Sequence, residues 1–136
     1  MSDFPSGAGL PSAGREAVRE AVRERLAAER AAACARIEAL ERDFGAIVAA
    51  NALVAVDDEH DPEGASTAFE RAHVAALLAQ AHDQVAELDR AGERLERGEY
   101  GRCEVCGEPI AAERLEVRPA AVTCVRCAAA RAHHPR

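Results

Sequence analysis

At 136 residues the chain fits a single domain, and we expect no large separate catalytic domain. Its residues are 49% hydrophobic but only 3% aromatic, a composition that favours long helices packed along narrow seams over a conventional globular core. The net charge is −7, and residues 15–97 hold 18 acidic residues against 11 arginines, so this part of the chain disfavours bare DNA and better fits a protein partner.

Residues 1–14 contain Pro, Ser and Gly and precede the first helical pattern. They lack the basic start and the apolar run of a signal peptide, and no stretch of the chain approaches the about 18 apolar residues of a membrane span. We therefore expect a flexible N-terminus and a cytoplasmic protein. Because that compartment keeps thiols reduced, the five cysteines favour metal binding over disulfide bonds.

Two apolar stripes, each repeating at seven-residue intervals, occupy residues 15–97. The first stripe consists of Leu26, Ala33, Leu40 and Ile47, with Ile37 and Phe44 in the complementary positions. The second consists of Val74, Ala81, Leu88 and Leu95, with Leu78, Val85 and Gly92 between them. Because the segment between the stripes is short, they predict an antiparallel two-helix coiled coil whose small seam residues let the helices approach closely.

The helical pattern breaks at about residues 51–66, the expected tip of the hairpin. This tip segment contains five carboxylates within seven positions: Asp57, Asp58, Glu59, Asp61 and Glu63. They could form a solvated loop, a site for a hard divalent cation or the contact end of the hairpin, although the spacing is not that of an EF-hand.

The beginning of the second helix has two alternatives, and its end has one clear signal. Asp61 can cap a helix that begins at Pro62, whereas Thr67 and Glu70 form a capping box for a later start. At the other end, Gly98 follows two arginines, so we expect the helix to end at about Arg97.

Two C-x-x-C pairs, Cys103 with Cys106 and Cys124 with Cys127, are separated by 17 residues. This spacing predicts one zinc ion held by four thiolates, and such a closed shell leaves no position for a catalytic water. The rival interpretation, a thioredoxin-like redox site, requires a strand-helix-strand context that the sequence lacks. Cys34, which lies in an alanine-rich turn, is expected to be a small, half-buried apolar residue. The tail 131–136, with His133 and His134, is expected to be solvated.

The residues around these cysteines resemble the DksA/TraR zinc-finger family. The resemblance is carried by GEYGRCEVCG at residues 98–107, Ile110, RLEVRP at residues 114–119 and CVRC at residues 124–127. It implies a protein that binds RNA polymerase, inserts its hairpin into the secondary channel and alters initiation through acidic residues of the tip.

Two departures from the family pattern concern the tip and the alarmone ppGpp. The family tip reads Asp-x-x-Asp-x-Ala, and here Asp58 and Asp61 are kept while Glu63 replaces the alanine, two residues farther from the finger. The basic positions that bind ppGpp in the family correspond here to Gln80, Asp83 and Glu87. Because none of these is a cation, we expect no DksA-like ppGpp site.

The sequence thus predicts a mainly α chain with a hairpin over residues 15–97, a zinc finger with a short C-terminal helix over residues 98–130, and a tail. We expect a monomeric, non-enzymatic transcription regulator that contacts RNA polymerase through Asp57, Asp58, Asp61 and Glu63, without membrane or sequence-specific DNA binding. The alternative is a protein–protein adaptor with an inert tip. A nucleic-acid-binding zinc ribbon is disfavoured, because residues 98–136 contain one aromatic residue, Tyr100, and about one net negative charge once zinc and four thiolates are counted.

Overall fold

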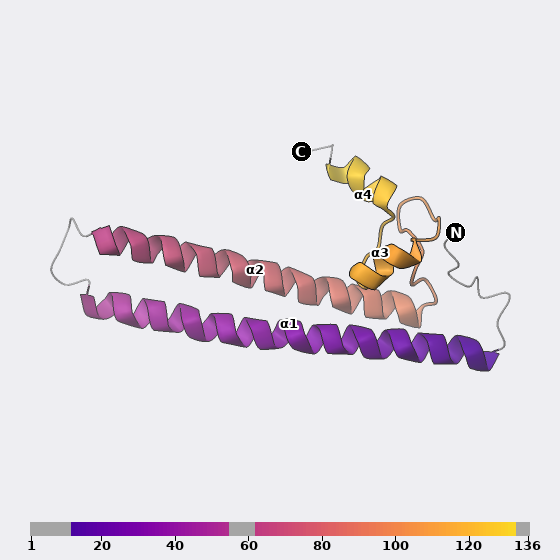
Figure 1. The fold of residues 1–136 in the computed structure, drawn as a ribbon, viewed down its shortest axis with the longest axis horizontal. Coiled ribbons are helices and arrows are strands. Elements are labelled where there is room, and N and C mark those ends of the chain that lie inside the picture. Colours follow the sequence, from indigo (N-terminus) through magenta and orange to yellow (C-terminus); the bar gives the residue numbers. More distant parts are fainter. Residues whose placement is uncertain (1–11, 55–61, 133–136) are drawn as a thin grey trace. The chain divides into compact units, whose positions relative to one another are not determined.

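The computed structural model describes residues 12–54 and 62–132. Its four helices are α1 (Ser12–Val54), α2 (Pro62–Glu96), α3 (Ala112–Val117) and α4 (Val125–Ala132) (Figure 1). The described residues form no β-strand, and their one bridge joins Arg102 to Pro109 in antiparallel fashion. None of the described helices is long and apolar enough to span a membrane. The mainly α prediction is therefore confirmed.

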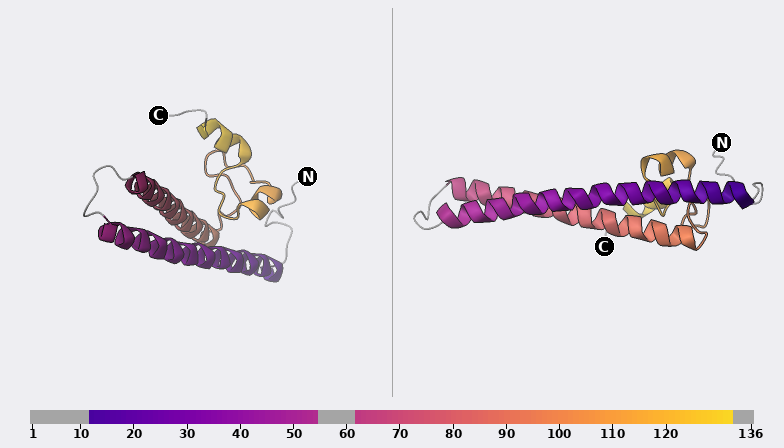
Figure 2. Two further views of the ribbon diagram at one scale, coloured as in Figure 1. Left: turned by 60° about the vertical axis from the view of Figure 1, so that its left-hand side comes forward. Right: turned by 90° about the horizontal axis from the view of Figure 1, so that it is seen from below.

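The chain divides into two compact units. Among the described residues, the finger unit contains residues 12–30 and 86–132, and the hairpin unit contains residues 31–54 and 62–85. In each unit, segments of α1 and α2 run side by side in opposite directions (Figure 2). Both helices are rich in alanine, leucine, arginine and glutamate, which are strong helix formers, and α1 runs for 43 residues with a single internal glycine after its first turn, Gly45.

The seam of the hairpin unit follows the predicted stripes. Ala33, Ile37 and Ala81 are buried. The remaining stripe residues of this unit are half-buried: Leu40, Phe44, Ile47, Val74, Leu78 and Val85. Across the seam, the Arg36 guanidinium donates a hydrogen bond of 2.8 Å to the side-chain oxygen of Gln84. The heptad pattern thus identified which faces of the two helices meet.

In the finger unit the same seam continues as an apolar cluster of Leu26, Leu88, Ala91 and Leu95. Ion pairs flank the cluster: Arg23 with Glu96 at 3.0 Å and Arg30 with Asp89 at 2.7 Å. One seam residue departs from expectation. A Cβ atom at Gly92 would meet nothing within 4 Å, so the helices do not approach closely there. A half-open groove of about 180 Å³ occupies this place instead.

The helix ends differ by a few residues from the predicted bounds. α1 begins at Ser12, inside the segment expected to be a flexible N-terminus, and continues to Val54. α2 begins at Pro62, the earlier of the two possible starts, so Thr67 lies within it. Asp61, the proposed cap, lies outside the described residues. α4 extends to Ala132, two residues beyond the predicted end of the finger.

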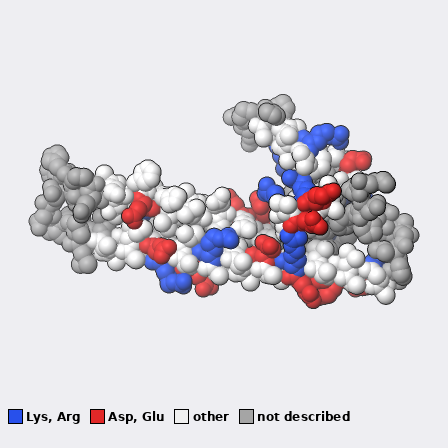
Figure 3. Space-filling model, viewed as in Figure 1, with Lys and Arg blue, Asp and Glu red and all other residues white. Residues whose placement is uncertain are grey.

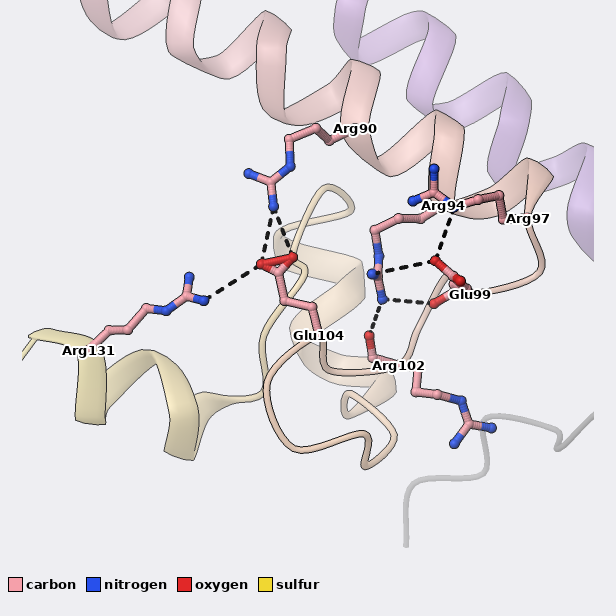
Figure 4. Close-up of polar contacts among 7 residues, drawn as sticks. All are labelled: Arg90, Arg94, Arg97, Glu99, Arg102, Glu104 and Arg131. Carbon is pink, nitrogen blue, oxygen red and sulfur yellow. Dashed lines mark hydrogen bonds and ion pairs between the residues drawn. The ribbon is translucent and has the colours of Figure 1, made fainter.

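α2 ends at Glu96 in a glycine-terminated turn. Gly98 has φ 75°, its N–H donates to the Leu95 carbonyl at 3.1 Å, and the Glu99 N–H donates to the Arg94 carbonyl at 2.8 Å. This pair of bonds is a Schellman motif, which needs a left-handed residue and therefore favours glycine. The Arg94 guanidinium donates to the carbonyls of Glu99 and Arg102 and so holds the chain that leads into the finger (Figure 4).

Candidate metal centre and the surrounding finger

The first two cysteines lie on a tight turn. The Cys103 N–H donates to the Glu108 carbonyl at 2.8 Å, and the Gly107 N–H donates back to the Cys103 carbonyl at 3.0 Å. Gly107 has φ 79°, a conformation that a side chain would strain. The Arg102 guanidinium also donates to the Gly107 carbonyl at 3.0 Å. This turn directs the thiols of Cys103 and Cys106 to the same side.

The second pair lies at the start of α4. Cys124 immediately precedes the helix and Cys127 lies in its first turn, where the Ala128 N–H donates to the Cys124 carbonyl at 2.9 Å. Between the two pairs, the chain passes through α3 and returns. Ile110, which is fully buried, packs with Leu115 and Ala121 beneath the cysteines. The finger is therefore a small core with the metal ligands along one edge.

The four thiol sulfurs lie within 4.8 Å of one another. The Cys106 and Cys124 sulfurs are 3.9 Å apart. Four sulfurs bound to zinc at tetrahedral angles lie about 3.8 Å apart, because each Zn–S bond is about 2.3 Å. The cluster therefore fits one zinc ion with only a small contraction, and the prediction of one structural Zn²⁺ is confirmed. Four cysteine ligands fill the tetrahedral shell, so the ion supports the fold and offers no site for a substrate.

Backbone N–H groups, neighbouring thiols and burial shift the pKa values of three of the four cysteines in different directions. Burial opposes ionisation of Cys103, which is 3% exposed, but backbone N–H groups of Cys106, Cys124 and Val105 outweigh it and lower the pKa of this thiol to about 6. The backbone N–H of Cys127 likewise lowers the pKa of Cys124. Hydrogen bonding to Cys124 and burial raise the pKa of Cys127 to about 12. Zinc must displace the proton of Cys127 at neutral pH.

Tyr100 joins the finger to the helices. Its ring packs against the apolar clusters of both the helices and the finger. Its hydroxyl donates a hydrogen bond of 2.7 Å to the Pro119 carbonyl. Burial raises the pKa of Tyr100, although the charge of Arg25 opposes this shift. One side chain thus contributes to both cores, and the sequence had identified it only as the single tyrosine.

Arg25 makes a second connection from α1. Its guanidinium donates to the carbonyls of Leu115, at 3.5 Å, and Glu116, near the C-terminal end of α3. The last carbonyls of a helix have no partners within the helix and carry partial negative charge, so a cation there is favourable. Arg25 therefore caps α3 and holds it against α1 within the finger unit.

Arginines from separate parts of the finger unit surround a pocket of about 180 Å³. The lining includes Arg90 of α2, Arg114 and Arg118 of the α3 region, and Arg131 of α4, together with Glu87. We call this the arginine pocket. Glu104 accepts from Arg90 at 3.0 Å and pairs with Arg131 at 3.6 Å (Figure 4). Sequence reasoning missed this group, because its members are scattered along the chain and no motif links them.

The remaining predicted residues lie apart from the metal centre or outside the described residues. Asp57, Asp58 and Asp61 lie outside the described residues, as do His133 and His134. Glu63 falls in the first turn of α2, where the structure describes the backbone only. Cys34 is half-buried on α1 in the hairpin unit, as expected for a small apolar residue, and does not belong to the four-cysteine cluster.

Two long helices followed by a four-cysteine cluster place the chain among C4-type zinc-finger proteins that carry a helical hairpin. The profile of the prokaryotic dksA/traR C4-type zinc finger matches residues 98–132. The RNA polymerase-binding transcription factor DksA of Caulobacter vibrioides is 49% identical over 41 residues, which are 30% of this chain and 29% of that protein. The uncharacterized protein YteA of Bacillus subtilis is 35% identical over 66 residues, 48% of this chain and 28% of that protein.

A solved structure extends the likeness beyond the finger. Transcription factor DksA2 from Pseudomonas aeruginosa matches with a TM-score of 0.72 and 28% identity, covering 96% of this chain and 95% of that one. Residues 98–132 form a zinc finger of the DksA/TraR family, and over nearly its whole length the chain is similar to DksA2. Its matched segments span less than a third of the curated relatives' length, so those proteins' activities come to it only as proposals.

Proposed function

We propose that this protein is a transcription regulator that binds RNA polymerase directly. Two similarities, one of the finger and one of nearly the whole chain, together support the proposal. The finger is similar to that of a protein named as RNA polymerase-binding, and the hairpin with its finger is similar to transcription factor DksA2 over nearly the whole chain. The negative charge of residues 15–97 is consistent with a protein partner and disfavours bare DNA. The closed zinc shell supports a binding role and offers no centre for catalysis.

In this proposal the hairpin enters the secondary channel of the polymerase, and the acidic tip approaches the active site. Zinc stabilises the finger, and Tyr100 and Arg25 hold the finger on the helices. The carboxylates of Asp58 and Asp61, with Asp57 and Glu63 beside them, alter initiation through their charge. The finger and the tip therefore have separable roles, one in folding and binding and the other in the effect on transcription.

A crosslinking experiment tests the position of the tip. A photo-reactive group at residue 58, in protein mixed with purified RNA polymerase, should crosslink to the walls of the secondary channel. A group at Asp43, an exposed carboxylate of α1, provides a comparison outside the tip segment. A strong complex without any tip crosslink to the channel would argue that the tip is inert.

A transcription assay tests the role of the tip carboxylates. Asp58→Asn and Asp61→Asn should leave folding and polymerase affinity near wild type, because each removes one charge and keeps the size of the side chain, while altering the effect on transcription. Asp43→Asn, which makes the same chemical change elsewhere, should alter neither. Equal loss of binding in the tip variants and in Cys124→Ser would contradict separate roles.

The second candidate function is an adaptor that uses the same scaffold to bind another protein. It is favoured by the acidic tip, which departs from the family pattern at Glu63. The dissociation constant for core RNA polymerase separates the two candidates. Binding in the micromolar range or tighter supports the regulator, whereas no measurable binding leaves the adaptor.

A second proposal concerns ppGpp and is limited to three positions of α2. Gln80, Asp83 and Glu87 supply no cation, and we propose that these α2 positions do not form a DksA-like ppGpp site. Glu87 nevertheless lines the arginine pocket, so arginines of the finger lie beside one of these three positions. A transcription effect that depends on ppGpp and is abolished by changing Gln80, Asp83 or Glu87 would contradict the proposal. Arg118→Ala is the comparison that tests the pocket itself.

A further inference from the structure

Phe69 on α2 is an aromatic residue that the fold leaves in solvent. Its side chain is 77% exposed, whereas Phe44, in the seam of the same unit, is half-buried. Among the large hydrophobic residues that the described structure exposes, the others are all valines. A phenylalanine carries the largest apolar surface of these side chains, and leaving it in water gives up stabilisation that burial would provide. The packing of the hairpin does not explain its presence at this position.

The side of α2 around Phe69 carries mostly small side chains and no acidic residue or arginine. Residues three, four and seven positions away share this side of the helix, and the exposed ones among them are Ala65, Ser66, Ala72, His73 and Ala76. We call Phe69 and the three alanines the Phe69 face, with Ser66 and His73 beside it. In the same unit, residues 44–54 of α1 contain no acidic or basic residue, and Val48 is exposed there. In Figure 3, the described surface on the hairpin side is largely white with separate acidic and basic side chains, whereas the charged side chains lie closer together over the finger.

We propose that the Phe69 face docks against an uncharged, apolar surface of RNA polymerase, with Phe69 as the main anchor. This inference rests on the proposed function, which puts the hairpin inside the polymerase. It adds a contact that is independent of the acidic tip, and it predicts the chemistry of the partner's surface. Exposed aromatic residues surrounded by small neutral ones are typical anchors of protein interfaces, because their burial excludes water from a compact patch.

Other occupants fit the charges less well. Nucleic acid needs cations beside a stacking aromatic ring, but the arginine closest to Phe69 in sequence, Arg71, is half-buried and, two positions along α2, lies on another side of the helix. An anionic membrane surface likewise needs basic residues at the edge of the apolar face, and positions 44–54 supply none. An apolar protein surface requires no such charges. The relative named as RNA polymerase-binding identifies which protein to test.

The test compares three variants of the full-length, zinc-loaded protein for affinity to purified core RNA polymerase. Phe69→Ala should weaken binding about 10- to 100-fold, as truncation of an interface anchor does. Phe69→Leu should weaken binding less than Phe69→Ala, because leucine keeps much of the apolar surface. Val117→Ala is the matched control, since Val117 is 81% exposed on the finger and should change affinity by less than about twofold. Helical circular dichroism should be equal in all variants, because the Phe69 ring is mostly in solvent.

The outcomes distinguish this inference from the proposed function. If the wild type binds polymerase and Phe69→Ala binds equally well, the Phe69 face is not an interface although the function stands. If the wild type does not bind polymerase, the proposed function fails and the inference fails with it. Sedimentation of the free protein provides a further arm. Self-association that Phe69→Ala abolishes would identify a second copy as the occupant and would overturn the proposal.

Discussion

Tyr100 links the finger to the helices through one side chain. Its ring contacts the cluster formed by Leu26, Leu88 and neighbouring residues, and it also contacts the cluster around Ile110. Its hydroxyl is hydrogen-bonded to the Pro119 carbonyl, so the polar end of a half-buried side chain is satisfied. The residue therefore contributes packing to two cores and a hydrogen bond within the finger.

Replacing Tyr100 by Phe separates these contributions. The ring and its packing remain, while the bond to Pro119 is lost, so the free energy of unfolding should fall by about 1 kcal/mol. Tyr100→Ala removes the packing as well and should cost about 3 to 5 kcal/mol. Urea unfolding of the zinc-loaded variants measures both changes. A Phe variant as unstable as the Ala variant would show that the hydroxyl, and not the ring, connects the finger to the helices.

The titration of Tyr100 provides a second prediction at this scale. Burial raises its pKa above the usual value of 10.0, and it is the single tyrosine in a chain without tryptophan. Tyrosinate absorbance should therefore report one transition with a midpoint above that of the urea-unfolded protein. The neutral form is favoured in the fold, so its contribution to stability is present below about pH 10 and is lost as pH rises through the folded pKa. Equal titration midpoints in the folded and the urea-unfolded protein would contradict the burial of Tyr100.

At the scale of elements, glycines have opposite roles in the helices and at their ends. Gly45 in α1 and Gly92 in α2 lie within helices, and an added Cβ would meet nothing within 4 Å at either position. Gly98, in contrast, has φ 75° in the turn that ends α2. Glycine weakens a helix interior, because it loses more backbone freedom than alanine on folding, but it relieves strain in the left-handed region.

Alanine substitutions at these glycines should therefore change the free energy of unfolding in opposite directions. Gly45→Ala and Gly92→Ala should each raise the free energy of unfolding by about 0.5 to 1 kcal/mol. Gly98→Ala should lower it by about 1 kcal/mol, because alanine would be strained in the left-handed turn. Thermal or urea unfolding of the three variants provides the comparison. A destabilised Gly92→Ala would mean that the groove beside it is narrower than the structure indicates.

At the scale of the whole molecule, two kinds of stabilisation act on different parts of the chain. The seam of the hairpin unit buries Ala33, Ile37 and Ala81 without help from metal. The finger has a small core of its own, with Ile110 as its single fully buried large side chain among the described residues, and depends on the four thiolates to close it. Such a module is coupled to its metal, since binding energy and folding energy are the same quantity there.

Removal of zinc should therefore unfold the finger selectively. A strong chelator should abolish hydrogen-exchange protection in residues 98–132 while leaving residues 31–54 and 62–85 protected. Acid should act in the same direction, because zinc binding requires thiolates. Zinc affinity should fall as pH is lowered, because protons compete with the metal for the four thiolates. Complete loss of helical circular dichroism on chelation would show that the hairpin also depends on the metal.

Much of the fold could be predicted because its signals are local in the sequence. A seven-residue apolar repeat identifies the seam faces of α1 and α2, and two C-x-x-C pairs identify the metal and its ligands. The start of α2 is not unique in the sequence, since Asp61–Pro62 and Thr67–Glu70 both satisfy the rules for a helix start. At Gly92 the two helices leave a groove, because a missing side chain permits close contact but does not require it.

Periodicity and short spacing in the sequence are enough to predict the two long helices, their buried stripes and the zinc-binding thiols. Only the tertiary structure revealed the contacts that join the finger to the helices and gather the arginines. Arg25 and Glu116 are 91 positions apart, and Arg90 reaches Glu104 across the turn that ends α2. Nothing in the local pattern pairs such residues. Their proximity follows from how the finger packs against the helices, through Tyr100, and from the return of the chain to complete the metal site.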